Sequence, residues 1–215
     1  MPLNTIRIFY GQATDSLADV YLEFLDADVA TSEILCQIKG PYSSQARTLP
    51  FTTRFELFDP PQLWRARIVD PCFWSLDQPS LYRVTLDLGY ERLSWHYFGI
   101  RRFGGNRQNL WLNGKRWVLR GAHWPESVRD PDWDAWRDAR LAMLVRDPSP
   151  QLCEQASENG VPLIVWLLQD RSSEQLAALS NWAAVCVAIV DGAPQVDPAL
   201  LRQSAPNVLL GQTVR

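Results

Sequence analysis

Hydrophobic and polar residues follow a strand-like pattern over the first part of the chain. Short segments rich in β-branched and aromatic residues alternate with turn residues, and no helical periodicity runs through them. The expected strands are residues 4–10, 18–25, 32–39, 47–58, 62–69, 81–88 and 93–101. Regularly spaced short strands with turns between them predict an antiparallel β-sandwich, which takes about 100 residues.

The second part of the chain follows a different pattern, in which short apolar runs alternate with amphipathic stretches. Asn113-Gly114 between two short strands is a strong hairpin signal. Beyond it, the expected strands are 143–145, 161–168, 184–190 and 208–210, and the expected helices are 133–140, 151–158, 174–179 and 198–203. Apolar strands that alternate with helices are typical of parallel β/α units. With a first strand after the hairpin, they make roughly half of a (β/α) barrel, which takes about 250 residues when complete.

These patterns predict two domains, a β-sandwich over residues 1–103 and a truncated barrel-like α/β domain over residues 104–215. The chain is 47% hydrophobic and 21% charged, which is enough apolar material for packed cores and excludes a disordered chain.

Composition also narrows the range of partners and compartments. The net charge of −3 is spread evenly, which argues against nucleic acid or an anionic membrane as a partner. The apolar run 161–168 is far shorter than the ~20 residues of a membrane span. The first residues lack the basic and apolar parts of a secretory signal, so we expect a cytoplasmic protein. The four cysteines are widely spaced, which favours free thiols, and we expect neither a metal nor a cofactor.

Four motifs carry a resemblance to a known family. They are the segment from Trp74 to Pro79, Leu81 and Tyr82; Phe98-Gly99-Ile100-Arg101; Leu112-Asn113-Gly114-Lys115; and Gly121-Ala122-His123-Trp124-Pro125. In this order they resemble glycoside hydrolase family 2, the β-galactosidase, β-glucuronidase and β-mannosidase superfamily. The resemblance implies an immunoglobulin-like middle domain followed by the N-terminal half of a TIM barrel. Most of these residues are expected to be structural, with Trp74 and Tyr82 as large plugs between the sandwich and its neighbour.

Catalysis in that family implies two carboxyl groups roughly 5 Å apart. The resemblance places the acid/base Glu in an Asn-Glu pair after the fourth barrel strand and the nucleophile Glu after the seventh. Here the fourth strand is followed by Asp191-Gly192-Ala193-Pro194, so the pair falls on Gly192 and Ala193. Asp191 is a nearby carboxyl group at the wrong offset, and the chain ends soon after the fifth expected strand. We therefore expect no recognisable catalytic carboxylates, which leaves enzymatic activity open.

Several residues are candidates for a sugar-binding role. Trp124 matches the tryptophan that helps to form the sugar site in mannosidase-like members, and Trp166 lies on the third barrel strand, where these members also place a Trp. Arg146 resembles the Arg that follows the second strand and steadies the catalytic carboxylate. His123 either binds a hydroxyl group or is an ordinary loop histidine.

Three functions remain open at this point. The first is a catalytically inactive relative that binds carbohydrate or another protein. The second is an active retaining β-glycosidase that hydrolyses O-glycosyl bonds, either through association of half-barrels or with an unorthodox carboxylate pair. The third is a fragment of a split glycosidase gene. Because an open parallel edge strand is a hazard, we expect an irregular C-terminal segment or a second subunit of a homo-oligomer to cover it.

Overall fold

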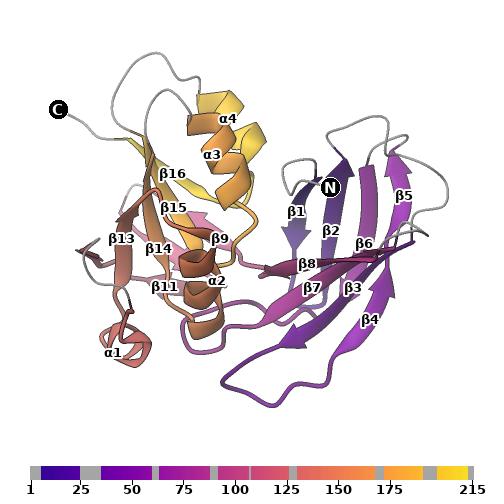
Figure 1. Ribbon diagram of the computed structural model, residues 1–215, viewed down its shortest axis with the longest axis horizontal. Coiled ribbons are helices and arrows are strands. Elements are labelled where there is room, and N and C mark those ends of the chain that lie inside the picture. Colours follow the sequence, from indigo (N-terminus) through magenta and orange to yellow (C-terminus); the bar gives the residue numbers. More distant parts are fainter. Residues whose placement is uncertain are drawn as a thin grey trace.

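The computed structural model describes residues 6–24, 35–59, 63–87, 92–106, 108–125, 130–167, 172–190 and 198–212. Two lobes lie side by side in Figure 1, an all-β lobe and a lobe of parallel strands with helices. The helices α2, α3 and α4 gather on the side of the parallel sheet that is nearer the all-β lobe (Figure 1). No helix in the described part of the chain is long and apolar enough to cross a membrane.

The all-β lobe is the predicted antiparallel sandwich. One sheet has the order β1 (Ile6–Ala13), β2 (Leu17–Phe24), β6 (Leu63–Val69) and β5 (Glu56–Asp59). The other has the order β4 (Phe51–Arg54), β3 (Leu35–Tyr42), β7 (Leu81–Asp87) and β8 (Arg92–Phe98). The inward-facing residues of both sheets form one apolar core, as in immunoglobulin-like domains.

One expected strand is divided between the two sheets. Residues 47–58 were predicted to be a single strand, whereas β4 pairs with β3 and β5 pairs with β6. The chain crosses between the sheets at Phe55, whose side chain is 5% exposed and whose amide donates to the Cys36 carbonyl at 3.0 Å. The alternation of apolar residues continues on both sides of this crossing, so the pattern predicts the strands and not the change of sheet.

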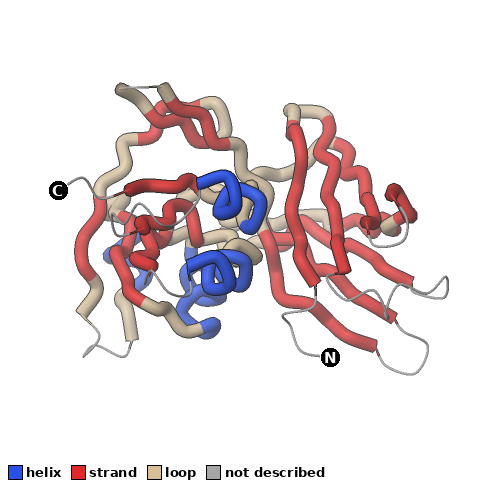
Figure 2. The backbone as a smooth tube through the Cα atoms, turned by 90° about the horizontal axis from the view of Figure 1, so that it is seen from above, coloured by secondary structure: helices blue, strands red, loops and turns tan. Residues whose placement is uncertain are grey.

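The second lobe begins with a small antiparallel sheet of β9 (Phe103–Gly105), β10 (Leu110–Leu112) and β11 (Lys115–Trp117). Asn113 and Gly114 turn between β10 and β11 with φ of 53° and 79°, so the predicted hairpin is confirmed. Figure 2 shows this sheet standing apart from the helices. The predicted domain boundary between residues 103 and 104 falls within β9 and stays a prediction.

Parallel strands follow in chain order, as the β/α pattern predicts. They are β12 (Gly121–His123), β13 (Ala142–Arg146), β14 (Leu163–Leu167), β15 (Val185–Val190) and β16 (Leu209–Gln212). The helices between them are α1 (Trp133–Asp138), α2 (Pro150–Asn159), α3 (Ser172–Leu179) and α4 (Pro198–Ser204). Ser149 caps α2 at its start and Gly160, with φ of 73°, ends it. We call these strands and helices the barrel segment.

The two lobes share buried contacts around the family-like motifs. Trp74 is fully buried in the core of the barrel segment, and its indole Nε1 donates to the Ser157 carbonyl at 2.8 Å. This contact confirms that Trp74 is a plug between the sandwich and its neighbour, whereas the same expectation for Tyr82 was wrong, because Tyr82 is buried inside the sandwich core. A Cβ on Gly99 would lie 2.7 Å from the Cβ of Ala183 and 2.8 Å from that of Trp74. Only glycine therefore lets the chain after β8 pass this close to the barrel segment.

Arg101 is the buried charge at this contact. Its side chain is 3% exposed, and its guanidinium donates to the carbonyls of Ala183, Val185 and Asn207, the last two at 2.8 and 3.2 Å. Burial raises the pKa of the Cys186 thiol beside it, so this thiol stays protonated. In the described part of the chain no carboxylate forms an ion pair with Arg101, and carbonyl groups replace its hydration.

Two asparagines extend the contact to the edge of the sandwich. Asn207 donates to the carbonyl of Tyr10 and accepts from its amide, both at 2.9 Å, and Asn181 accepts from the amide of Ile8 at 3.3 Å. Side-chain amides thus satisfy backbone groups of the edge strand β1 that would otherwise face water or another chain. We call Trp74, Gly99, Arg101, Asn181 and Asn207 the inter-lobe joint.

Substitution of Arg101 tests how much the joint stabilises the fold. Arg101→Met should lower the free energy of unfolding by about 2–3 kcal/mol, because it leaves buried carbonyls without a donor. Arg102→Met is the matched control. Arg102 lies 4.3 Å from the ring centroid of Phe73 and pairs with the exposed Asp15, so its loss should cost about 1 kcal/mol or less. Urea unfolding measures both values, and equal losses would contradict a special role for Arg101.

Candidate functional site

The site candidates lie at one end of the parallel sheet. His123 is the last residue of β12, Trp124 follows it directly, and Arg146 ends β13. Trp166 is the next-to-last residue of β14. Barrel enzymes hold their active sites at this end, where the strands finish. Asp191 follows β15 and lies outside the described residues.

Strand register assigns three of these residues to one face of the sheet. His123 pairs with Leu144, and Arg146 pairs with Trp166. Each of these two pairs belongs to a row of residues that lie side by side across the sheet. The rows continue through apolar residues of the neighbouring strands, which are Ile164, Val187, Ile189 and Leu209. We call this the inner face, because it corresponds to the interior of a barrel. Arg146 and Trp166 are in contact on it, with the guanidinium carbon 5.6 Å from the centre of the indole ring.

The opposite face of the sheet is covered by helices. Met143, Val145, Val165 and Ala188 point to this side in the register, and all of them are buried. On the inner face, by contrast, Leu144, Trp166, Ile189 and Leu209 are only partly buried. The sheet is therefore well packed on the helix side and less so on the inner side.

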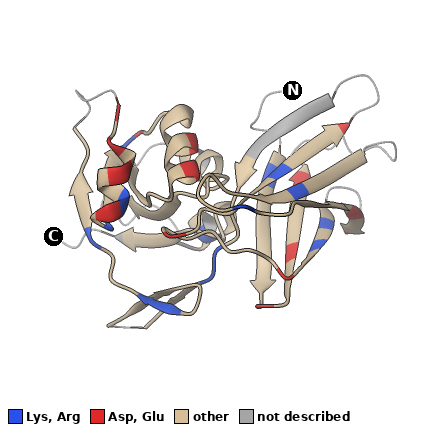
Figure 3. Ribbon diagram, turned by 90° about the horizontal axis from the view of Figure 1, so that it is seen from below, with Lys and Arg blue, Asp and Glu red and all other residues tan. Residues whose placement is uncertain are grey.

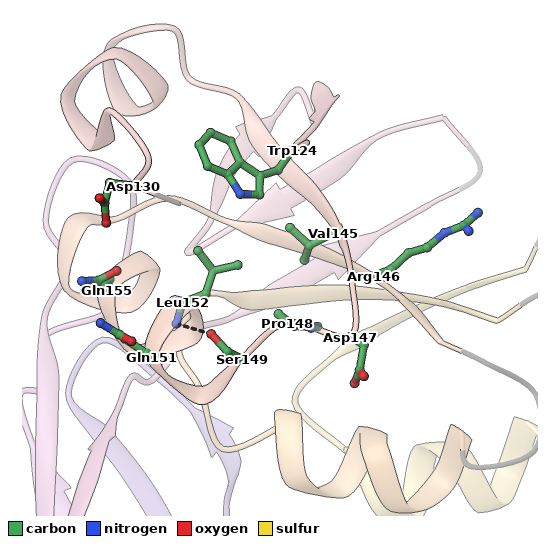
Figure 4. A pocket seen from close by; sticks show the side chains of 10 residues that line it. All are labelled: Trp124, Asp130, Val145, Arg146, Asp147, Pro148, Ser149, Gln151, Leu152 and Gln155. Atoms are coloured by element: carbon green, nitrogen blue, oxygen red, sulfur yellow. Dashed lines mark hydrogen bonds between the residues drawn. The ribbon is translucent and has the colours of Figure 1, made fainter. Parts of the chain in front are cut away.

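Trp124 lies on the helix side of the sheet. Its amide donates to the Leu144 carbonyl at 3.0 Å, and its ring contacts Trp136 of α1 edge to face, with centroids 6.1 Å apart. Figure 4 shows the ring near Val145 and Leu152, whereas the Arg146 side chain extends away from it. By register, Trp124 and Trp166 thus lie on opposite faces of the sheet, with Arg146 at the end of the strand between them.

A cavity of about 490 Å³ lies beside Trp124, between the ends of β12 and β13 and the first turns of α2. Val145, Pro148 and Leu152 give it an apolar floor. Its polar residues are Asp130, Arg146, Asp147, Ser149, Gln151 and Gln155. The Ser149 hydroxyl accepts from the Leu152 amide at 3.2 Å as the helix cap, which leaves the carboxylates, the two glutamine amides and Arg146 as the main polar residues.

The chemistry of this cavity suits a neutral polyhydroxylated ring. An indole and aliphatic side chains can contact the C–H groups of such a ring, and carboxylate and amide groups can bind its hydroxyls. Four neighbours of Trp124 were not predicted from the sequence, and these are Asp130, Trp136, Gln151 and Gln155. The spacing of Trp133 and Trp136 is typical of a helix, but it does not specify which side of the sheet that helix covers. Among the residues that the structure describes, no group of three or more His, Cys, Asp or Glu side chains is placed to hold a metal ion.

The distribution of charged residues does not indicate a second site. Figure 3 shows basic and acidic positions interspersed over both lobes, without a broad surface of one sign among the residues drawn in colour. The described part of the chain therefore offers no evident basic surface for nucleic acid.

Comparison with known proteins bears on the fold. No protein-family model and no curated protein matches the chain. Among solved structures, it is similar to a β-glycosidase from Bacteroides vulgatus (TM-score 0.68, 13% identity, 98% of this chain and 33% of that one). It is also similar to a glycosyl hydrolase family 2 member from Bacteroides cellulosilyticus (TM-score 0.67, 15% identity, 98% of this chain and 36% of that one). A third similar structure is the β-glucuronidase of Parabacteroides merdae (TM-score 0.63, 16% identity, 97% of this chain and 34% of that one).

The chain has a family 2 glycosidase fold. It spans about a third of the length of these glycosidases, and at these identities the likeness concerns the fold. The family-like motifs of the sequence lie within the matched part, and Trp74, Gly99 and Arg101 form the joint between its two lobes. The expected immunoglobulin-like sandwich followed by a partial barrel is confirmed.

Proposed function

We propose that this chain is a non-catalytic, carbohydrate-binding relative of the family 2 glycosidases. The observation that carries the proposal is the cavity beside Trp124, which combines an indole, an apolar floor and a polar rim at the functional end of a glycosidase-type sheet. A sugar would lie against Trp124 with its hydroxyls bound by Asp130, Gln151 and Gln155. Trp166 and His123 would then form an inner-face part of the ancestral site, and Arg146 would border both this part and the cavity.

The residues after the fourth parallel strand support the absence of catalysis. Strand order makes β15 the fourth strand of the barrel segment, and the sequence after it is Asp191-Gly192-Ala193-Pro194. The Asn-Glu pair that the family resemblance places here falls on Gly192 and Ala193, neither of which has a titratable side chain. Without a general acid, a retaining hydrolase cannot protonate the leaving group.

An active retaining β-glycosidase completed by a second polypeptide is the alternative. The partly exposed apolar residues of the inner face favour it, since further β/α units or a second subunit would bury them. In that case the partner would supply the missing carboxylates, and Asp191 would be the candidate on this chain.

Aromatic substitutions on the two faces test where a sugar binds. Methyl β-mannoside, methyl β-galactoside and methyl β-glucuronide serve as probes in NMR titrations. We expect at least one to bind, and Trp124→Ala to weaken it about tenfold because a stacking surface is lost. Trp124→Phe keeps much of the packing against Trp136 and should bind with intermediate affinity. Trp166→Ala is the control, and a loss of binding only in this variant would move the site to the inner face.

Activity assays test the absence of catalysis. The protein should release no nitrophenol from nitrophenyl β-mannoside, β-galactoside or β-glucuronide, and Asp191→Asn should behave in the same way. Turnover that disappears in Asp191→Asn would contradict the proposal and support the active alternative.

Association of the chain tests the role of the inner face. We expect a dimer or larger homo-oligomer in size-exclusion chromatography with light scattering, and Leu209→Glu should dissociate it by placing a charge on this face. Val118→Glu is the matched control, because Val118 is already 62% exposed and lies outside the inner face. A monomeric wild-type protein would contradict the expectation that a second copy of the chain covers the inner face.

A further inference from the structure

A second cavity lies where the sandwich meets the C-terminal end of α2. Its volume is about 460 Å³, and its lining includes Tyr42, Ser44, Thr48, Tyr97 and Glu158. The cavity beside Trp124 lies at the opposite end of the same helix, whose ten residues extend over about 15 Å. The two cavities are therefore separate. None of the expected sugar-site residues lines this one, and Leu81 is its one lining residue from the family-like motifs.

Glu158 provides the carboxylate of this second cavity. Partial burial raises its pKa, with a further contribution from Glu154 one turn earlier on the helix. Among the described residues, no basic side chain forms an ion pair with this carboxylate. Its backbone carbonyl accepts a hydrogen bond from the Ser44 hydroxyl at 2.8 Å, which holds the loop after β3 against the end of α2. The cavity thus has a fixed wall that carries an uncompensated negative charge.

Two tyrosines form the aromatic part of the cavity. Tyr42 and Tyr97 pack edge to face, with centroids 5.7 Å apart and an interplanar angle of 75°. The Arg83 guanidinium lies 5.9 Å from the centroid of Tyr42, so this ring already interacts with a cation. Arg83 is not part of the cavity lining, and no Lys or Arg is found among the described residues that form it.

We propose that this cavity binds a primary ammonium group, which pairs with Glu158 while the carbon skeleton of the ligand packs against Tyr42 and Tyr97. An ammonium supplies the positive charge that Glu158 lacks, and aromatic rings tolerate cations at their faces. An anion would be repelled by Glu158 and Glu154. The ammonium could be carried by an amino sugar or by an alkyl amine of the lysine side-chain type, and both have the same recognition chemistry at the carboxylate.

Matched pairs of probes separate charge from shape. 5-Aminopentanol and 1,5-pentanediol differ in the ammonium group, and glucosamine in its protonated form and glucose differ in the same way on a sugar ring. In NMR titrations of the full chain, each amine should bind at least roughly tenfold more tightly than its neutral counterpart. The shifted amide signals should include residues 42–48 and 158. Tighter binding of glucosamine indicates an amino-sugar ligand, and tighter binding of aminopentanol indicates an alkyl amine.

Glu158→Gln tests the carboxylate, with Glu154→Gln as the matched control on the same helix. Glu158→Gln should weaken amine binding roughly tenfold, whereas Glu154→Gln, which does not line the cavity, should change it only about twofold. Because the folded-state pKa of Glu158 is raised, its charged form opposes folding at neutral pH. The Gln variant should therefore be at least as stable as the wild type in urea, and a loss of binding could not be a loss of fold.

Three results would overturn the proposal. They are equal affinity for the amines and their neutral counterparts, unchanged amine binding in Glu158→Gln, and signal changes confined to the cavity beside Trp124. Failure of the sugar-binding proposal is a separate outcome, since it is measured with neutral methyl glycosides and Trp124 variants.

Discussion

The arrangement of the two lobes depends on one buried guanidinium. Arg101 lies between β8 and β9, and its guanidinium donates to three carbonyl groups at the beginning of β15 and just before β16. A charge in this position requires nearly complete hydrogen bonding, because its desolvation is costly. The partners must therefore approach closely, and Gly99 permits the approach while Trp74 fills the space beside it. Packing, polar contacts and backbone geometry at the joint all favour one orientation of the lobes.

The joint also determines which surfaces are free to bind ligands. Asn181 and Asn207 form hydrogen bonds with backbone groups of the edge strand β1, so contacts within the protein occupy this edge of the sandwich. The barrel segment presents the ends of its strands away from the joint, and both cavities border α2, which lies between the sheet and the sandwich side. The proposed sugar and ammonium sites would then share a rigid helix without sharing any side chain.

Much of the fold follows from patterns that act over short distances. Asn113-Gly114 specifies its hairpin locally, and Gly160 ends α2 with a left-handed conformation that glycine adopts at little cost. The crossing at Phe55 was missed because the alternation of apolar residues is the same in either sheet. The position of Trp124 and Trp166 on opposite faces of the sheet could not be predicted for a related reason. Motif resemblance identifies a residue's place along a strand, whereas the face depends on register with neighbouring strands, which the sequence of one strand does not contain.

The positions of the joint contacts along the strands have a consequence for evolution. Asn181 and Ala183 come just before β15, Ser157 comes before β14, and Asn207 comes before β16, so the interactions between the lobes cluster where the parallel strands begin. Catalytic and binding residues of barrels lie at the other end. Substitutions at the strand ends would leave the joint untouched, so selection for folding and selection for chemistry act on different residues. A scaffold built in this way can lose, keep or replace its chemistry by mutation without first losing its shape.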